Sequence, residues 1–282
     1  MIPGLSVGAA PVLSTVLTPS VTSRTAEFFC DLDYLLMDGT DTESHAIGIE
    51  HVGGPELVVA VTDATRRIGA IRVETHSPGT LLFIDNREWR GALHANLRVL
   101  GPDCALIFND IANGFVGLDV FLRSGRQVLY WGTGATAASC NIEMEGDELV
   151  AAIGDDALIS NGVWLRNHGM HALHDLATGE MIGRPPVSTV VERHVWIGQD
   201  VLMLGCERIG MGSVVGARAL VNGTLPACVV ATGTPARVQR EGISWGRDRG
   251  GMTAAERTAL CLPATPAPLP APPAAPGRRR RG

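Results

Sequence analysis

The sequence predicts an all-β fold, a three-sided solenoid of short strands, and three observations support it. Aliphatic side chains recur at every sixth position in two stretches of the second half of the chain. A glycine follows several of these positions, and a small or β-branched residue stands four positions after most of them. The aliphatic positions are Ile153, Ile159, Leu165, Val191, Ile197, Met203, Ile209, Val215 and Val221.

A period of six fits neither of the common elements, because a helix repeats every 3.6 residues and a strand every two. A triangular coil with six residues on each side does produce it. The aliphatic side chain then points into the core, and the following glycine sits at a crowded corner that has no room for a side chain. These glycines are Gly154, Gly198, Gly210 and Gly216.

The first half of the chain is less regular. Residues 1–45 show no repeat, so we expect an irregular N-terminal segment with a short helix or edge strand at 26–37 and disorder before it. Over 46–150, short β-rich runs alternate with turn residues, which predicts irregular coils of the same solenoid; a separate β-sandwich is the alternative. The clearest runs include Glu56–Val61, Ile68–Val73, Thr80–Ile84, Ala105–Phe108 and Val116–Leu122.

The regular part is predicted over 151–245, with one interruption. The six-residue step breaks between Leu165 and Val191, and one coil side plus a long insertion accounts for the gap. We therefore expect an ejected loop at about 167–189, rich in histidine. Long loops on a regular scaffold are where functional sites are commonly built.

The last segment, 246–282, is expected to hold a capping helix within Thr253–Leu260 and then a disordered tail. A solenoid end needs a cap because an open edge exposes unpaired backbone groups. The tail is a Pro/Ala tract that ends in four consecutive arginines. Such a composition cannot bury a core.

Composition excludes several classes. The net charge of −6 does not suit nucleic-acid binding. No run of about 18 apolar residues is present, so no membrane-spanning helix is expected. The first basic residue, Arg24, follows the apolar start, which argues against a secretory signal. Six scattered cysteines indicate reduced thiols, and we expect a cytoplasmic protein.

Longer segments resemble a known family. HVWIGQDVLMLGCERIGMGSVVGARALV followed by VVATGTPARV is similar to the last coils of the hexapeptide-repeat acyltransferases. IGDDALISNGVWLRN, HALHDLATGE and HVWIG look most like the bacterial O-acetyltransferases of capsular polysaccharide and O-antigen. The resemblance is clear over 139–240, weak over 90–138 and absent outside 45–245. It implies a left-handed parallel β-helix, a homotrimer, and transfer of an acetyl group from acetyl-CoA to a hydroxyl of a sugar or glycan.

The resemblance also assigns catalytic residues. Acetyl transfer to an alcohol needs a base, and the pKa of histidine suits that role. In the family the loop before HVWIG supplies this histidine, and His171 stands at the matching position. His168 is the second candidate, and Asp175 could hold the imidazole in the required tautomer. If His171 is not the base, the alternative is a loop histidine that hydrogen-bonds to the backbone.

Acetyl-CoA would bind along the coils. Trp196 matches the position that lines the pantetheine cleft between subunits, although a tryptophan there could also cap a coil corner. Gly198 is the expected backbone donor to the oxyanion. Asn222-Gly223 replaces a usual basic residue, which puts one phosphate contact in doubt. The segments expected to contact the nucleotide are represented by Gly216, Ala217, Gly233 and Arg237.

Two other functions compete with this one. A zinc enzyme like the γ-type carbonic anhydrases uses the same fold and three histidines. The candidate ligands His168, His171, His174 and His194 make it conceivable, but their spacing differs from that family's, so no metal is expected. The other alternative is a non-catalytic β-solenoid binding module, which would not need to eject a histidine-rich loop from a regular coil.

Overall fold

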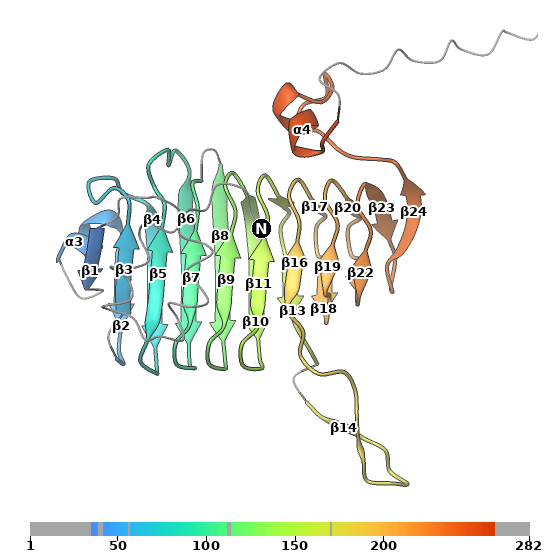
Figure 1. Cartoon of the computed structure of the whole chain (residues 1–282), viewed down its shortest axis with the longest axis horizontal. Helices are drawn as coiled ribbons and strands as arrows, with labels where there is room; N and C mark the ends of the chain where they lie inside the picture. The colour runs from blue at the N-terminus through green and yellow to red at the C-terminus, as the bar shows by residue number, and fades with distance from the viewer. Residues whose placement is uncertain (1–34, 39–41, 56, 112–113, 170, 263–282) are drawn as a thin grey trace, which may run out of the picture. The chain divides into compact units, whose positions relative to one another are not determined.

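The computed structural model describes residues 35–38, 42–55, 57–111, 114–169 and 171–262. The chain divides into two compact units, Met1–Trp245 and Gly246–Gly282. Within the first unit the described strands form a parallel β-solenoid, as a hexapeptide-repeat β-helix requires (Figure 1). The predicted fold class is therefore confirmed. The predictions for 1–34 and for the tail from 263 lie outside the described residues.

Two large sheets build the solenoid. Among the described residues, nine strands form the first sheet, and all of its neighbours pair in parallel except β1 with β3. In order along the sheet they are β1 (Leu35–Asp38), β3 (Leu57–Val61), β5 (Thr80–Ile84), β7 (Ala105–Phe108), β9 (Val128–Trp131), β11 (Val150–Ile153), β16 (Thr189–Val191), β19 (Arg208–Ile209) and β22 (Thr224–Leu225).

The second sheet has thirteen described strands. It starts after helix α3 (Thr42–Ile47) with five strands of four to nine residues, β2 (Ile49–Val52), β4 (Gly69–Thr75), β6 (Ala92–Val99), β8 (Phe115–Leu122) and β10 (Thr136–Met144). It continues in short strands, β12 (Leu158–Ile159), β13 (Val163–Arg166), β17 (Trp196–Ile197), β18 (Leu202–Leu204), β20 (Val214–Val215), β21 (Leu220–Val221) and β23 (Val229–Thr232), and ends at the antiparallel β24 (Arg237–Glu241).

The coil length changes along the axis. In the first half, Leu81 pairs with Ala105, Ala105 with Val128, and Val128 with Val150, so equivalent places recur after 24, 23 and 22 positions. After the break, Val191 pairs with Ile209, and the recurrence falls to 18 positions, which is three sides of six. Because both halves share the same two sheets, the β-sandwich alternative for 46–150 is wrong. The predicted runs at 80–84 and 105–108 coincide with β5 and β7.

Strand β10 marks the change between the two kinds of coil. Its nine residues pair with two different strands of the next coil, β12 through Thr136 and β13 through Cys140. Between β12 and β13 the chain turns at Gly162, whose φ of +71° is a left-handed conformation that favours glycine. One long strand is thus replaced by two short strands and a corner.

The core is the stack of inward side chains. All nine aliphatic positions of the six-residue repeat are at most 2% exposed, as predicted. Burial of each such side chain stabilises the fold by about 1.5–3 kcal/mol. The longer coils add large aromatic side chains to this core, namely Trp89, Phe108 and Trp131. A wider coil encloses more volume, and close packing requires larger side chains to fill it.

The corner glycines are required by the spacing between coils. A Cβ atom on Gly198 would lie 2.7 Å from the Val215 carbonyl oxygen in the next coil. A Cβ on Gly154 would lie 2.6 Å from the backbone nitrogen of Arg193. Both distances are too short for any side chain, so the corner role predicted for these glycines is confirmed.

The second unit contains α4 (Ala254–Ala259), inside the range predicted for a helix. Thr253 and Glu256 form a reciprocal capping box at its start, which satisfies backbone N–H groups that a helix leaves unpaired. Within the described residues, no helix has the length and apolar character that crossing a bilayer requires.

Candidate active site

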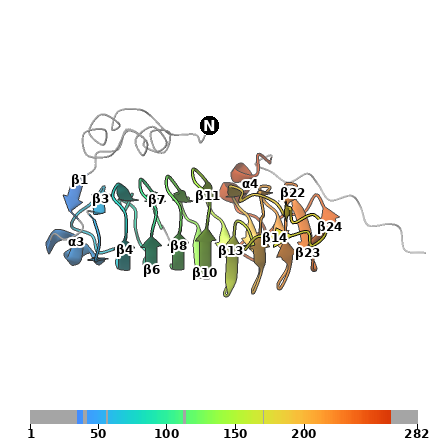
Figure 2. The ribbon, with the colours of Figure 1, turned by 90° about the horizontal axis from the view of Figure 1, so that it is seen from below.

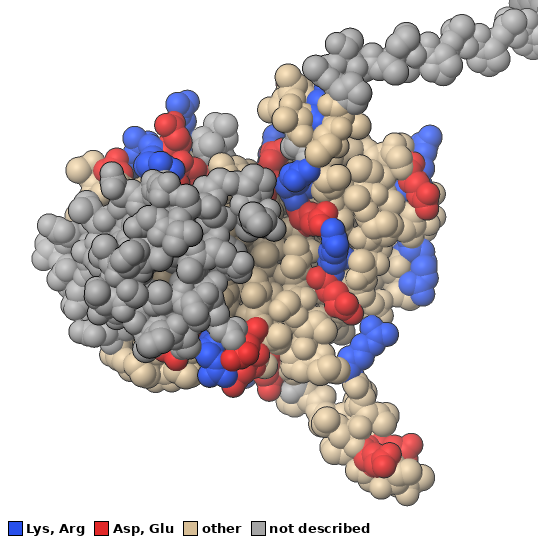
Figure 3. Space-filling model, in the orientation of Figure 1, with Lys and Arg blue, Asp and Glu red and all other residues tan. Residues whose placement is uncertain are grey.

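A hairpin interrupts the coils directly after β13. Ile153 pairs with Val191, 38 positions later, which is twenty more than the regular spacing. The extra residues form a small antiparallel hairpin of β14 (Leu173–His174) and β15 (Met181–Ile182) that leaves the stack (Figure 1). All four strand residues are exposed, and acidic side chains gather near the end of the hairpin (Figure 3). The predicted insertion is therefore confirmed in place and extent.

Asp175 closes the turn of this hairpin. Its carboxylate accepts backbone N–H bonds from Thr178 at 2.9 Å and from Ala177 at 2.8 Å. These bonds favour the charged form and lower the pKa of Asp175. Within the described residues no hydrogen bond joins Asp175 to His171. The geometry thus gives Asp175 a turn role and provides no contact for the imidazole-orienting role.

The two candidate bases occupy different environments. His168 is half-buried at the root of the hairpin, with its Nε2 3.0 Å from Glu145 Oε2. The buried Asn167 fixes this root, because its amide donates to the Glu145 carbonyl at 2.7 Å and accepts the Glu145 N–H at 3.0 Å. His171 lies further out and is exposed. Sequence reasoning missed Asn167 and Glu145, whose pairing depends on adjacent coils.

Trp196 lies on β17, in the first coil after the hairpin, and its side chain is 38% exposed. Its indole N–H donates to Ser160 Oγ at 3.3 Å. The ring of Trp245 lies beside it, with centroids 6.1 Å apart and planes tilted by 52°. Trp196 is therefore held in place while much of its surface is open to a ligand.

His194 is a buried structural residue. Its Nδ1 is 2.7 Å from Asp156 Oδ2 and its Nε2 is 2.9 Å from the Trp245 carbonyl oxygen. The imidazole stacks on Trp245 at 4.4 Å, and the Trp245 indole N–H donates to the His194 carbonyl at 2.8 Å. Both ring nitrogens of His194 face oxygen atoms of the chain. His194 is therefore not available as a ligand for the zinc ion of the alternative function. Among the described residues no group of three His, Cys, Asp or Glu is arranged to hold a metal.

The expected CoA-binding residues fall into two groups. The N–H of Gly198 donates to the Val215 carbonyl and that of Gly216 to the Ala231 carbonyl, each at 2.8 Å. The oxyanion role expected for Gly198 therefore does not hold in this geometry, since its only N–H already has a partner. The other three residues are exposed near the last coils. They are Ala217, Gly233, which turns with a φ of +98° after β23, and Arg237, which begins β24.

One chain does not bring these residues together. His171 lies on the hairpin that leaves the stack, whereas Trp196 lies on the body of the coils (Figure 1). Among the described residues no hydrogen bond or ring contact joins His171 to Trp196. The fold defines a class of protein, a parallel β-solenoid with a single imidazole-bearing hairpin ejected from its coils.

Comparison with known proteins identifies relatives of the chain. No family model matches it. Over 159 residues it is 30% identical to the putative lipopolysaccharide biosynthesis O-acetyl transferase WbbJ of Escherichia coli (strain K12), a match that covers 51% of this chain and 79% of that protein. Over 96 residues it is 38% identical to the galactoside O-acetyltransferase of the same strain, covering 34% of this chain and 46% of that protein.

A solved structure agrees on the fold. The polysialic-acid-specific acetyltransferase NeuO superposes with a TM-score of 0.50 and 21% identity, over 68% of this chain and 96% of that chain. The chain belongs to the hexapeptide-repeat acetyltransferases. The match spans less than half the length of the galactoside O-acetyltransferase.

Proposed function

We propose that this protein is a CoA-dependent O-acetyltransferase that moves an acetyl group from acetyl-CoA to a hydroxyl of a sugar or glycan. The observation that carries the proposal is the hairpin with His171, which breaks an otherwise regular series of short coils. Relatives named as galactoside and lipopolysaccharide O-acetyltransferases support the choice of reaction and of acceptor.

In the proposed reaction the imidazole of His171 is the general base. It takes the proton of the acceptor hydroxyl while that oxygen attacks the thioester carbonyl carbon. The tetrahedral oxyanion collapses, the carbon–sulfur bond breaks, and the CoA thiolate takes the proton from the imidazolium. The exposed position of His171 supports this role, because an acceptor can reach it. His168 is less suited, since its side chain is only 14% exposed at the root of the hairpin.

The site would be completed by a second copy of the chain. His171 and Trp196 have no described contact within one subunit, although base and thioester must meet in the reaction. We propose a homotrimer in which the hairpin of one subunit reaches the coils of another, with Trp196, Gly216, Ala217, Gly233 and Arg237 on the CoA side. An exposed arginine suits a phosphate.

The cytoplasm is the proposed compartment. Acetyl-CoA is available there, and the buried Cys104, Cys140 and Cys206 are free thiols. Burial raises the pKa of Cys104 to about 11 and of Cys206 to about 12, so both stay protonated and unreactive. A protein of this kind needs no oxidising environment.

The test is a thiol-release assay with acetyl-CoA against a panel of sugars and glycans. His171→Ala should lower kcat by a factor of about 10² to 10⁴, the usual contribution of a general base. His174→Ala is the matched control, because His174 is exposed on the same hairpin. Both variants should keep the thermal unfolding midpoint of the wild type and the same oligomeric state in solution. Unchanged turnover in His171→Ala, or an equal loss in His174→Ala, contradicts the base assignment.

A further inference from the structure

The outer side of the second sheet carries two rows of aligned side chains. Four neighbouring strands, β6, β8, β10 and β13, contribute one residue each to a row (Figure 2). Adjacent strands lie about 4.8 Å apart, so each row runs along the solenoid axis. The first row is Asn96, Asp119, Asn141 and Trp164, and the second is Arg98, Phe121, Glu143 and Arg166. We call the two rows together the polar face.

Contacts within the polar face hold its side chains in fixed positions. Glu143 is buried between two guanidinium groups, at 2.7 Å from Arg123 and 3.1 Å from Arg166. The guanidinium of Arg98 lies 4.5 Å from the centre of the Phe121 ring and 3.3 Å from Asp119. Such ion pairs and cation–π contacts on neighbouring strands stabilise a sheet. They also reduce the entropy that side chains would lose on binding a ligand.

The polar face is hollowed. A pocket of about 310 Å³ lies over it, lined by Arg98, Asp119, Phe121, Asn141 and Trp164 among others. The side chain of Trp164 is 39% exposed. The Arg98 and Asp119 side chains, which line this pocket, are 40% and 46% exposed, so a guanidinium donor and a carboxylate acceptor are both open to a ligand. The surface therefore offers an open aromatic ring beside both donors and acceptors.

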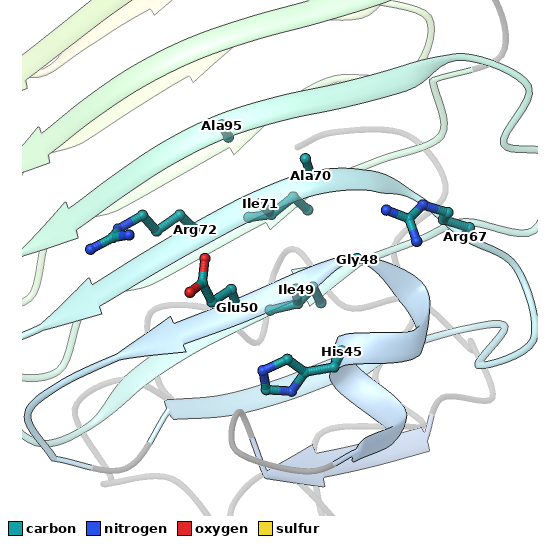
Figure 4. A pocket seen from close by; sticks show the side chains of 9 residues that line it. All are labelled: His45, Gly48, Ile49, Glu50, Arg67, Ala70, Ile71, Arg72 and Ala95. Carbon is teal, nitrogen blue, oxygen red and sulfur yellow. The ribbon is translucent and has the colours of Figure 1, made fainter.

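The first row continues toward the N-terminal end of the solenoid. Asn96 pairs with Arg72 on β4, and Arg72 pairs with Glu50 on β2. A second pocket, of about 350 Å³, lies at this end, and both charged side chains line it (Figure 4). The two pockets thus lie along one line of alternating polar groups. An elongated surface of this kind fits a chain-like ligand better than a single small molecule.

The chemistry of the row selects a glycan. A sugar ring has hydroxyl groups around its edge and C–H groups on its faces, so it can bond to amides and carboxylates while packing on an aromatic ring. The carboxylates of Glu50 and Asp119 on the line of the first row, and of Glu143 in the second row, offset the neighbouring arginines. A surface with this charge balance would repel a nucleic-acid backbone as much as attract it.

The far end of the row meets the hairpin. Trp164 lies on β13, which ends at Arg166, and the hairpin root at Asn167 and His168 follows directly. We propose that the polar face binds an extended glycan acceptor and directs one of its hydroxyl groups toward the hairpin. This inference rests on the proposed function for the identity of the ligand as an acceptor. It makes Trp164 and Asn141 specificity-determining residues that select a polymer over a monosaccharide.

The first test measures binding without acetyl-CoA. Migration of the protein is followed in native gels that contain polysialic acid, an O-antigen polysaccharide or a galactan, and in gels with the monosaccharides. At least one polymer should retard the wild type. Trp164→Ala should raise at least tenfold the polymer concentration that is needed for half of the maximal retardation. Trp164→Phe keeps a ring and should restore most of it. The control is Phe115→Ala, because Phe115 is a similarly exposed aromatic residue of the same sheet, at the start of β8 and outside both rows.

The second test separates this inference from the proposed activity. With a polymeric acceptor, Trp164→Ala should raise KM at least tenfold with kcat changed less than twofold, and KM for a monosaccharide should not change. The proposed glycan-binding role of the polar face is refuted if no polymer retards the wild type. It is also refuted if Phe115→Ala weakens retardation as much as Trp164→Ala does. Retardation that depends on Trp164 without any acetyl transfer supports the surface and refutes the enzyme activity. Transfer with KM values unaffected by Trp164→Ala refutes the surface alone.

Discussion

The coils before residue 153 and those after residue 191 share two sheets but differ in length and content. The earlier coils repeat after 22 to 24 positions, and the later coils after 18 and, at the last coil, 16. Strand β10 in the earlier part has nine residues, whereas β17 and β18 in the later part have two and three. The earlier core holds Trp89, Phe108 and Trp131, and the later core up to Val221 is filled mainly by aliphatic side chains.

The difference shows that the two kinds of coil provide different surfaces within one fold. The short coils have tightly spaced corners, where Gly198 permits an approach that no side chain would allow. The long coils offer broad outer surfaces, on which strands β4, β6, β8 and β10 present aligned rows of polar residues. The hairpin leaves the body where the first kind of coil gives way to the second. A ligand on the long coils therefore lies beside the hairpin of its own chain, whereas a cofactor on the short coils would meet the hairpin of another subunit in the proposed homotrimer.

The largest expected effect tests the two cores. Phe108→Ala should lower the free energy of unfolding by about 3–5 kcal/mol, because a cavity replaces a fully buried ring. Ile209→Val in a short coil should cost only about 0.5–1.5 kcal/mol, since one methylene is lost. Urea denaturation followed by circular dichroism measures both. Equal losses would mean that the wide core is not closely packed around its aromatic residues.

A buried carboxyl in the long coils gives an intermediate effect. Burial, and then the nearby charge of Asp85, raise the pKa of Asp110 to about 6. A folded-state pKa above the unfolded value of 3.8 means that stability falls as pH rises from about 4 through 6. Asp110→Asn removes the charge and can keep the oxygen that accepts the Glu88 N–H, so it should gain on the order of 2 kcal/mol at pH 7.5.

Thermal unfolding across pH 4 to 8 measures this gain. The control is Asp175→Asn on the hairpin, where backbone N–H bonds lower the pKa, so no gain at neutral pH is expected. A wild-type midpoint that does not fall between pH 4 and 6 relative to that of Asp110→Asn would contradict the raised pKa.

The smallest effect on stability should follow removal of the hairpin. Deleting residues 168–187 joins Asn167 to Ser188 and restores between Ile153 and Val191 the spacing that separates Val191 from Ile209. The hairpin strands are exposed, and loop length has a weak effect on stability. The free energy of unfolding should therefore change by about 1 kcal/mol or less. Acetyl transfer should be abolished. A deletion variant that fails to fold would show that the hairpin also supports the coils.

The sequence was most informative where one physical rule applies at every repeat. Each short coil must bury an aliphatic residue at the same place, so Val191, Ile197 and Ile209 could be assigned to the core directly. The long coils were harder because their repeat length changes from one coil to the next, and no single step reveals it. Their strands were predicted, but their coil length was not.

The candidate site was less predictable, because contacts between distant residues decide it. The sequence identified the ejected loop and its histidines, and the structure showed that the loop is a hairpin. It did not reveal that Asp175 is engaged in the turn, or that the N–H of Gly198 is already paired with Val215. The pairing of His194 with Trp245, 51 residues apart, has no local signal at all.

Periodicity alone determined that this chain winds as a solenoid and that one long loop leaves it, because burial repeats with the coil. The tertiary structure decided which donors and acceptors are already used, and which side chains line up on neighbouring strands. Those outcomes depend on the register between coils, and a change of one residue in coil length would rearrange every row.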